Sequence, residues 1–407
     1  MDVPPPAELL ERVRSLRAAG PLLAGLPDAS DVYLVGGAVR DLLLHRTPHE
    51  LDLVVDGDVA EIAAALGGEL RLYDRFGTST VRLGDFTYDI ARSRRETYAH
   101  PGALPDVTPA PLDVDLLRRD FTVNSLAAAL AGPEAGVIRF PSGALDDLAL
   151  GRLRVLHDGS FRDDPTRMLR LARYAGRLGF AVEPHTRELL DDALAAGALT
   201  TVSGSRAGAE LRLLASELDP IAALVSAGEL GIDRAIHPRL HLDDPELAGR
   251  ALSLLPADGR RDRLALALAA REIPEHELAA LLESLAFEAP DRDAIVAAAT
   301  RAPELARRLR AAQRPSQIAA AIGPGARPEL VALAGALGAE REASEWLTRL
   351  REIKLEIDGS DLIAAGLSQG PAVGRGLAAA LAAKLDGLAR DRAAELAEAL
   401  RAANDSG

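Results

Sequence analysis

The stretch Leu34-Val-Gly-Gly-Ala-Val-Arg-Asp41 decides the fold of the first third of this chain. The apolar run 32–35 predicts a short buried strand, and the amphipathic stretch that continues to Leu44 predicts a helix. Between them, Gly36 and Gly37 let the backbone turn sharply and approach a ligand closely, and the start of the helix offers free N–H groups. The pattern is neither a Walker A loop nor a GxGxxG sequence, so alone it fits a phosphate site or a purely structural turn.

The flanking sequence extends this alternation of strand and helix through residues 31–140. Short apolar runs predict further strands, helical spacing predicts one more helix, and a cluster of prolines predicts a long loop. The predicted strands lie at 51–55, 69–73, 79–83 and 87–91, the helix at 59–66 and the loop at 94–115. Residues 160–400 are rich in Ala, Leu, Arg and Glu at helical spacing and predict helices only, without a fixed repeat.

These patterns predict an α+β protein, in which a small mixed α/β head with a sheet of about five strands precedes an all-α remainder. The predicted divisions are an N-terminal helical extension (1–30), the head (31–145), a helical neck (146–215), a helical body (216–300) and a helical tail (301–407).

Composition limits the classes of function. The 407 residues carry a net charge of −14, which argues against a protein that binds any nucleic acid, so RNA binding would need locally concentrated positive charge. Only Lys354 and Lys384 are lysines among the 47 basic residues, so an anion site must be built from arginine. The absence of long apolar runs predicts no membrane span, and the absence of cysteine favours the reducing cytoplasm.

Two carboxylates are predicted to lie side by side in Glu50-Leu-Asp52. If this tripeptide is part of a strand, the period of two places both side chains on one face, where a cation would relieve their repulsion. Hard oxygen ligands of this kind suit Mg²⁺ that bridges the phosphates of a nucleotide. Asp89, on a neighbouring predicted strand, is a further candidate ligand, and a solvated strand edge is the alternative.

The string Arg118-Arg-Asp-Phe-Thr-Val-Asn-Ser125 is longer and more specific. Asp120 is predicted to cap a following helix, and Arg119 to clamp phosphate.

A basic helix is predicted from Phe161-Arg-Asp-Asp-Pro-Thr-Arg-Met-Leu-Arg-Leu-Ala-Arg-Tyr174. Asp-Asp-Pro is typical of a helix start, with the proline in the first turn. Four arginines then share an arc of roughly 120° on one side of the helix, opposite its apolar residues. They are Arg167, Arg170, Arg173 and Arg177. This face is either solvated or directed at an anion.

Taken in order, these motifs resemble the class II tRNA nucleotidyltransferases and the bacterial poly(A) polymerases. The matching strings are LVGGAVRD (34–41), ELD (50–52), RRETY (94–98), RRDFTVNSLA (118–127), RDDPTRMLRLARY (162–174) and, in the tail, IDGSDLIAAGLSQGPAVGRGL (357–377). The resemblance implies addition of nucleotides to an RNA 3′ end without a template, from CTP and ATP. The head would be the nucleotidyltransferase domain, the neck would recognise the base, and neck and tail would bind the tRNA 3′-end substrate.

The resemblance also implies a role for each matched residue. Glu50 and Asp52, with Asp89 as a further candidate, would hold the catalytic Mg²⁺ ions. The nucleotide site would comprise Gly36, Gly37, Arg40, Arg119, Asp120, Asn124, Asp164, Arg167, Arg170 and Arg173. Asp164 and Arg167 would read the base.

Simple chemistry supports base reading by such a pair. A carboxylate accepts a hydrogen bond from the amino group of cytosine or adenine, and a guanidinium donates to the adjacent ring nitrogen. Uracil and guanine present a carbonyl at that position, and two acceptors facing each other in a closed pocket are strongly disfavoured.

Several alternatives stay open. The family usually has aspartate at position 50, and glutamate reaches one methylene further, which affects metal geometry. The leading hypothesis is an enzyme that builds or repairs the 3′-terminal CCA of tRNA, and the alternatives are an A-adding or CC-adding enzyme or a poly(A) polymerase. A non-enzymatic alternative is an inactive RNA-binding homologue.

Overall fold

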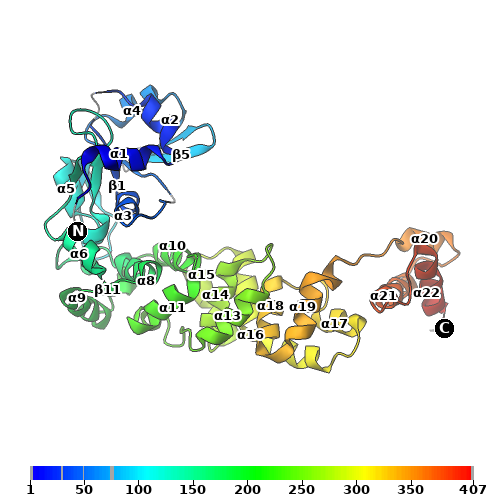
Figure 1. Cartoon of the computed structure of the whole chain (residues 1–407). Helices are drawn as coiled ribbons and strands as arrows, with labels where there is room; N and C mark the ends of the chain where they lie inside the picture. Colours follow the sequence, from blue (N-terminus) through cyan, green and yellow to red (C-terminus); the bar gives the residue numbers. More distant parts are fainter. Residues whose placement is uncertain (1–2, 29–30, 49, 74–77, 405–407) are drawn as a thin grey trace. The chain divides into compact units, whose positions relative to one another are not determined.

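Strand β1 (Val32–Val35) lies inside a seven-stranded sheet in the computed structural model, which describes residues 3–28, 31–48, 50–73 and 78–404 (Figure 1). The strand order is β3-β4-β5-β2-β1-β8-β9, and among neighbouring strands of this described sheet only β5 and β2 pair in parallel. The other strands of this sheet are β2 (Leu53–Val55), β3 (Glu69–Tyr73), β4 (Thr78–Leu83), β5 (Phe86–Arg92), β8 (Ala127–Ala129) and β9 (Ile138–Arg139).

Two smaller pairs of strands and a set of helices complete this part of the chain. The pairs are β6 (Arg94–Thr97) with β7 (Asp106–Pro109), and β10 (Arg152–Leu153) with β11 (Ala181–Val182). The helices are α1 (Pro6–Arg14), α2 (Ala19–Gly25), α3 (Gly37–Leu43), α4 (Val59–Leu66), α5 (Leu112–Leu117), the 3₁₀ turn η2 (Thr122–Asn124), α6 (Ala144–Leu150), α7 (Ser160–Asp163), α8 (Thr166–Leu178), α9 (Pro184–Ala195), η3 (Ala198–Thr201) and α10 (Gly204–Ala215).

Alternation along the strands builds the core of the sheet. Tyr33 and Val35 of β1 pack with Val54 of β2 and with Leu112 and Leu116 of α5. Leu34, between them, is fully buried and points to the opposite face, as a period of two requires. Because both faces of β1 are covered, the strand is apolar throughout, and the glycine turn that follows it has a fixed position.

The remainder is helical. Its elements are α11 (Pro220–Glu229), α12 (Ile232–Ile236), α13 (Pro245–Leu254), α14 (Arg261–Ala269), α15 (Glu275–Ser284), α16 (Ala289–Ala311), α17 (Pro315–Ile322), α18 (Pro328–Ala334), the π-helical turn η4 (Gly335–Ala339), α19 (Glu340–Thr348), η5 (Leu350–Glu352), α20 (Gly359–Ala364), α21 (Pro371–Leu385) and α22 (Arg392–Asn404). Several helices, α9 among them, begin at a proline, whose missing N–H costs nothing there. Within the described ranges, no helix is long and apolar enough to cross a membrane.

The chain divides into two compact units, Met1–Ala207 and Gly208–Gly407. The predicted α+β architecture, with a mixed α/β head before a helical remainder, is confirmed. The finer division into extension, head, neck, body and tail stays a prediction.

Three details of the prediction were wrong. The sheet has seven strands rather than about five, because the alanine-rich stretch 127–129 pairs with β1 despite its helical composition. The predicted loop 94–115 contains the β6–β7 hairpin and the start of α5. The short strand at 181–182 interrupts the stretch that was predicted to be helical throughout.

The conformation of Gly36 yields a stability prediction. Its φ of 69° and ψ of −130° are rarely adopted by residues with a side chain. Gly36→Ala should therefore lower the free energy of unfolding of the N-terminal unit by about 1–3 kcal/mol, measured by urea denaturation. The matched control is Gly20→Ala in α2, where an added methyl group meets open space and the change should be neutral or slightly stabilising. Equal effects of the two substitutions would show that the backbone conformation at Gly36 carries no such cost.

Candidate functional site

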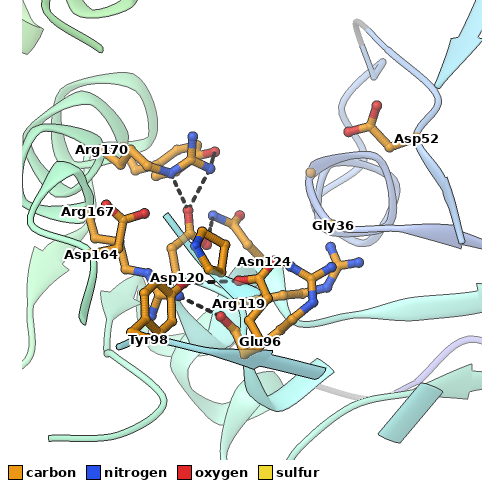
Figure 2. Close-up of a pocket in the computed structure, with 14 residues that line it drawn as sticks. Gly36, Asp52, Glu96, Tyr98, Arg119, Asp120, Asn124, Asp164, Arg167 and Arg170 are labelled. Carbon is orange, nitrogen blue, oxygen red and sulfur yellow. Dashed lines mark hydrogen bonds and ion pairs between the residues drawn. The ribbon is translucent and has the colours of Figure 1, made fainter. Parts of the chain in front are cut away.

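A polar cavity of about 360 Å³ opens in the N-terminal unit where five segments meet. These segments are the turn after β1, the residue before β2, the β6–β7 hairpin, residues 118–124 and the start of α8 (Figure 2). The lining residues are Gly36, Gly37, Asp52, Glu96, Tyr98, Pro105, Arg118, Arg119, Asp120, Asn124, Asp164, Arg167, Arg170 and Tyr174. Its volume is within the range of sites that bind small ligands.

Arg119 lies over the glycine turn. Its Nη1 atom is 3.3 Å from the position that a Cβ of Gly36 would occupy, and its Nη2 atom donates to Asp115 Oδ2 at 3.0 Å. The buried Nε atom of Arg119 has no hydrogen-bond partner among the described residues. Burial, followed by the neighbouring charge of Arg118, lowers the pKa of Arg119 against the effect of Asp115. The turn therefore presents a poorly hydrated cation, suited to an anion such as phosphate.

Asp120 joins three elements. It accepts hydrogen bonds from its neighbour Phe121 N at 2.8 Å, from Asn124 Nδ2 at 3.1 Å and from Arg170 Nε at 2.9 Å. Burial alone would raise the pKa of Asp120, but the charge of Arg170 and the hydrogen bonds from Asn124 and Arg170 lower it. The prediction that Asp120 caps a helix was wrong, because a 3₁₀ turn and then a strand follow it. It is instead a buried anion that fixes Arg170 at the cavity.

Asp164 and Arg167 form another part of the wall. Arg167 is buried, and its guanidinium donates to Ser160 Oγ and to the carbonyl of Arg118, both at 2.7 Å. Asp164 accepts from the backbone and hydroxyl of Thr166 just before α8 begins. Pro165 is the N-cap of α8 rather than part of its first turn, which was predicted otherwise. This segment places a carboxylate and a guanidinium together at the cavity (Figure 2).

The hairpin supplies site residues that sequence reasoning had not selected. Glu96 accepts from Arg94, Arg118 and the hydroxyl of Tyr98, the last at 3.0 Å. Burial, the charge of Glu96 and this hydrogen bond raise the pKa of Tyr98 to about 12, so its hydroxyl stays protonated at physiological pH. Glu96 and Tyr98 belong to the string RRETY, and their i, i+2 spacing is the signal that could have identified them.

Tyr174, also missed, is surrounded by guanidinium groups. Those of Arg40, Arg170, Arg173 and Arg177 lie between 5.2 and 5.7 Å from its ring centre. Its hydroxyl accepts from Arg170 at 3.2 Å. The predicted basic face of α8 is thus largely packed against an aromatic ring, and Arg167 and Arg173 are buried rather than solvated.

The cavity gathers nine of the predicted site residues and leaves four outside its lining. Those it gathers are Gly36, Gly37, Asp52, Arg119, Asp120, Asn124, Asp164, Arg167 and Arg170. Arg40 is buried behind the cavity, where it donates to Asn124 Oδ1 at 2.5 Å and pairs with Asp41. Arg173 packs on Tyr174. Glu50 and Asp89 also lie outside the lining.

The carboxylates at positions 50, 52 and 89 are the candidates for a metal site. Residues 50–52 precede β2 rather than forming part of it, so the prediction of a shared strand face was wrong. Glu50 and Asp52 are nevertheless both exposed. Asp89 lies just before Ile90, which pairs with Leu53, so Asp52 and Asp89 occupy equivalent positions in adjacent parallel segments of the chain.

The surroundings of the Asp52 carboxylate favour a bound cation. Although part of Asp52 is accessible, the surrounding protein removes some of its hydration; this, followed by the charges of Glu50 and Asp89, raises the pKa of Asp52, and Arg119 offsets the rise only in part. Within the described residues, no three His, Cys, Asp or Glu side chains are grouped tightly enough to hold a metal ion alone. Mg²⁺ commonly uses one or two carboxylates plus phosphate oxygens, so these donors fit an ion that arrives with a nucleotide.

The contribution of the Asp120–Arg170 ion pair to stability can be tested by comparing neutral and acid pH. Asp120→Asn should lower the free energy of unfolding by about 3 kcal/mol at pH 7, because it leaves the guanidinium without its buried counter-charge. The folded-state pKa of Asp120 is lowered, so the stabilisation is fully present above the unfolded-state value and is lost as the pH falls through the folded-state value.

Urea denaturation between pH 7 and pH 3 measures this effect. The difference in the free energy of unfolding between wild type and Asp120→Asn should become smaller as the pH falls. Asp113→Asn is the control, since that side chain is 76% exposed and its contact with Arg139 spans 3.8 Å. A difference in the free energy of unfolding that does not change with pH would show that the ion pair is not the cause of the difference.

Comparisons with known proteins find similarity both in sequence and in fold. Residues 32–154 match the model of the poly A polymerase head domain. The chain is 40% identical over 216 residues to an A-adding tRNA nucleotidyltransferase of Geobacter sulfurreducens, covering 52% of this chain and 24% of that relative. It is 41% identical over 199 residues to a CC-adding tRNA nucleotidyltransferase of Deinococcus radiodurans, covering 48% and 52%. The chain thus spans from about a quarter to half of these relatives.

A solved structure extends the similarity along the whole chain. The CCA-adding enzyme of Thermotoga maritima, solved in complex with tRNA, aligns with a TM-score of 0.73 at 25% identity and covers 98% of this chain and 99% of that one. The glycine turn and the 118–124 segment lie within the stretch that matches the head domain, and α8 follows that stretch in the chain. Residues 32–154 thus match the poly A polymerase head domain, and the chain is similar in sequence to tRNA nucleotidyltransferases and in fold to CCA-adding enzymes.

Proposed function

We propose that this protein is a tRNA nucleotidyltransferase that adds or repairs the 3′-terminal CCA of tRNA from CTP and ATP without a nucleic-acid template, releasing pyrophosphate. One observation carries the proposal: a single cavity joins an exposed carboxylate at Asp52, a desolvated arginine over a glycine turn, and the pair Asp164 and Arg167. Those are the parts needed to activate a hydroxyl, hold a triphosphate and select a base.

The acidic edge of the cavity is the place for the reacting ends. Glu50 and Asp52, with Asp89 nearby, would hold Mg²⁺. The ion, when bound, would neutralise phosphate charge and make the RNA 3′-hydroxyl a better nucleophile. Asp52 supports this role because its surroundings already disfavour an uncompensated negative charge.

The basic middle of the cavity would hold the triphosphate. Arg119 offers an Nε atom that has no hydrogen-bond partner in the part of the chain that the structure describes, and Asp120 keeps Arg170 in place. Gly36 and Gly37 allow close approach because neither carries a side chain. Arg40 and Arg173 would act from behind, Arg40 by fixing Asn124 and Arg173 by packing on Tyr174.

Asp164 and Arg167 would select the base. Arg167 is anchored by Ser160 and by a backbone carbonyl, so its remaining donor directions are fixed before a nucleotide arrives. A preorganised donor beside a carboxylate acceptor matches the edge of cytosine and adenine and opposes that of uracil and guanine. We propose the cytoplasm as its location, because a chain without cysteine fits a reducing compartment.

Addition of A alone, or of CC alone, is the second candidate function. The observation that favours it is that relatives at 40% and 41% identity carry the names A-adding and CC-adding tRNA nucleotidyltransferase. The chemistry at the cavity would be the same, and the products would differ only in length and sequence.

A primer-extension assay tests the proposal and separates the two candidates. Three tRNA transcripts that end before CCA, after C and after CC are each offered CTP, ATP, UTP or GTP singly, and then CTP with ATP, in the presence of Mg²⁺. Completion of CCA on all three transcripts is expected, with UTP and GTP rejected. Addition of a single A to the CC-ending transcript alone would establish the A-adding candidate, and no incorporation on any transcript would exclude both.

Glu50 gives a second prediction. Glu50→Gln should reduce the incorporation rate by about 100-fold, because an amide neither carries charge nor binds Mg²⁺ well, whereas Glu50→Asp should retain activity. The control is Glu61→Gln, at an exposed position of α4, which should leave the rate unchanged. Equal activity of Glu50→Gln and wild type would remove Glu50 from the metal site.

A further inference from the structure

Arg206 contacts the carboxylate proposed to read the base, although it does not line the cavity. It lies in the first turn of α10, and its Nη2 atom donates to Asp164 Oδ1 at 2.9 Å. Its Nη1 atom donates to the carbonyl of Gly102 at 2.8 Å. The two partners are 62 positions apart in the chain, and one planar guanidinium joins them.

All the hydrogen bonds that Asp164 accepts within the described residues fall on the same oxygen. Thr166 donates to Oδ1 from its backbone at 3.1 Å and from its hydroxyl at 2.6 Å, and Arg206 is the third donor. Oδ2 is thus the oxygen left for a ligand at the cavity. A carboxylate turns easily about its terminal torsion, so anchors on one oxygen are what fix the direction of the other.

Gly102 lies in the loop of the β6–β7 hairpin, and this loop is held firmly. Gly102 N donates to the carbonyl of Arg162 at 3.2 Å, and a Cβ at Gly102 would lie 2.3 Å from Thr201 Oγ1. With φ at 71°, the position also favours glycine. Tyr98 and Pro105, at either end of the same loop, line the cavity. Arg206 therefore connects the cavity wall to the carboxylate.

We infer that Arg206 is a positioning residue for base selection, which holds Oδ1 of Asp164 against the hairpin loop so that Oδ2 faces the amino group of cytosine or adenine. This inference rests on the proposed function and deepens it. Arginine suits the task because its planar fork serves two acceptors at once, whereas lysine presents a single point of charge. Loss of Arg206 leaves the phosphate-binding residues untouched and frees the carboxylate to rotate.

The test compares Arg206→Gln, Arg206→Lys and Thr166→Val with wild type. Arg187→Gln on the neighbouring α9 is the matched control, since it removes the same charge from an exposed ion pair with Asp191. For each variant, calorimetry measures Kd for CTP, UTP, ATP and GTP without tRNA, and the incorporation assay measures kcat and KM. Melting curves report folding.

In Arg206→Gln, the preference for CTP over UTP and for ATP over GTP, taken as the ratio of their Kd values and of their kcat/KM values, should fall about tenfold. The kcat for the correct nucleotides should stay within about threefold of wild type. Arg206→Lys and Thr166→Val should lose part of the preference, and Arg187→Gln none. If Arg206→Gln does not fold, Arg206→Lys carries the comparison. A merely structural role would reduce kcat for all four nucleotides equally.

The two proposals fail in different ways. If wild-type protein binds nucleotides selectively but incorporates none, the proposed function is overturned. The Kd values from calorimetry then still test the role of Arg206. Unchanged preferences in folded Arg206→Gln would overturn the role of Arg206, whatever the incorporation assay shows. Wild-type protein that binds all four nucleotides equally would overturn it as well.

Discussion

The ion pair between Asp120 and Arg170 is the interaction on which the site depends. A carboxylate as buried as Asp120 is unfavourable unless its oxygens are satisfied, and its donors come from three places: its own turn, the 3₁₀ turn η2 and helix α8. Through Asn124 the same network reaches Arg40 on α3. The glycine turn, the 118–124 segment and α8 therefore meet where they do because one buried charge needs all of them.

The charges around the cavity are arranged in opposition. Asp52 lies near two other carboxylates and is short of positive partners, whereas Arg119 is short of hydration and keeps one nitrogen unpartnered among the described residues. Each imbalance is relieved by a ligand of the opposite sign, so a metal-bound triphosphate would satisfy both ends at once. The lining holds four arginines and four carboxylates, so the site separates charges of opposite sign within one cavity and carries no large net charge.

The sequence allowed the segments that form the site to be predicted, but not most of the contacts between these segments. The glycine turn and the start of α8 follow from local patterns, since a buried strand, two glycines and a proline each constrain their neighbours directly. The sheet was underestimated because Ala127–Ala129 is strand only through pairing with β1, which no local propensity reveals. The resemblance assigned Arg40 and Arg173 to the nucleotide site, and both lie outside the cavity lining, because a matching motif does not show which other side chains cover a residue.

The β6–β7 hairpin, which the proline-rich sequence 94–115 led us to predict as a loop, connects the base side of the cavity to its phosphate side. Arg118 donates from its side chain to Glu96 of β6, and its carbonyl accepts from Arg167, the guanidinium proposed to read the base. Its neighbour Arg119 lies over the glycine turn. Arg118 therefore links β6 to the base side of the cavity, and the next residue, Arg119, lies on the phosphate side. Since Arg118 and Arg119 are neighbours in the chain and both donate to Asp115, the hairpin, the residue proposed to read the base and the arginine proposed to hold the triphosphate belong to one connected network.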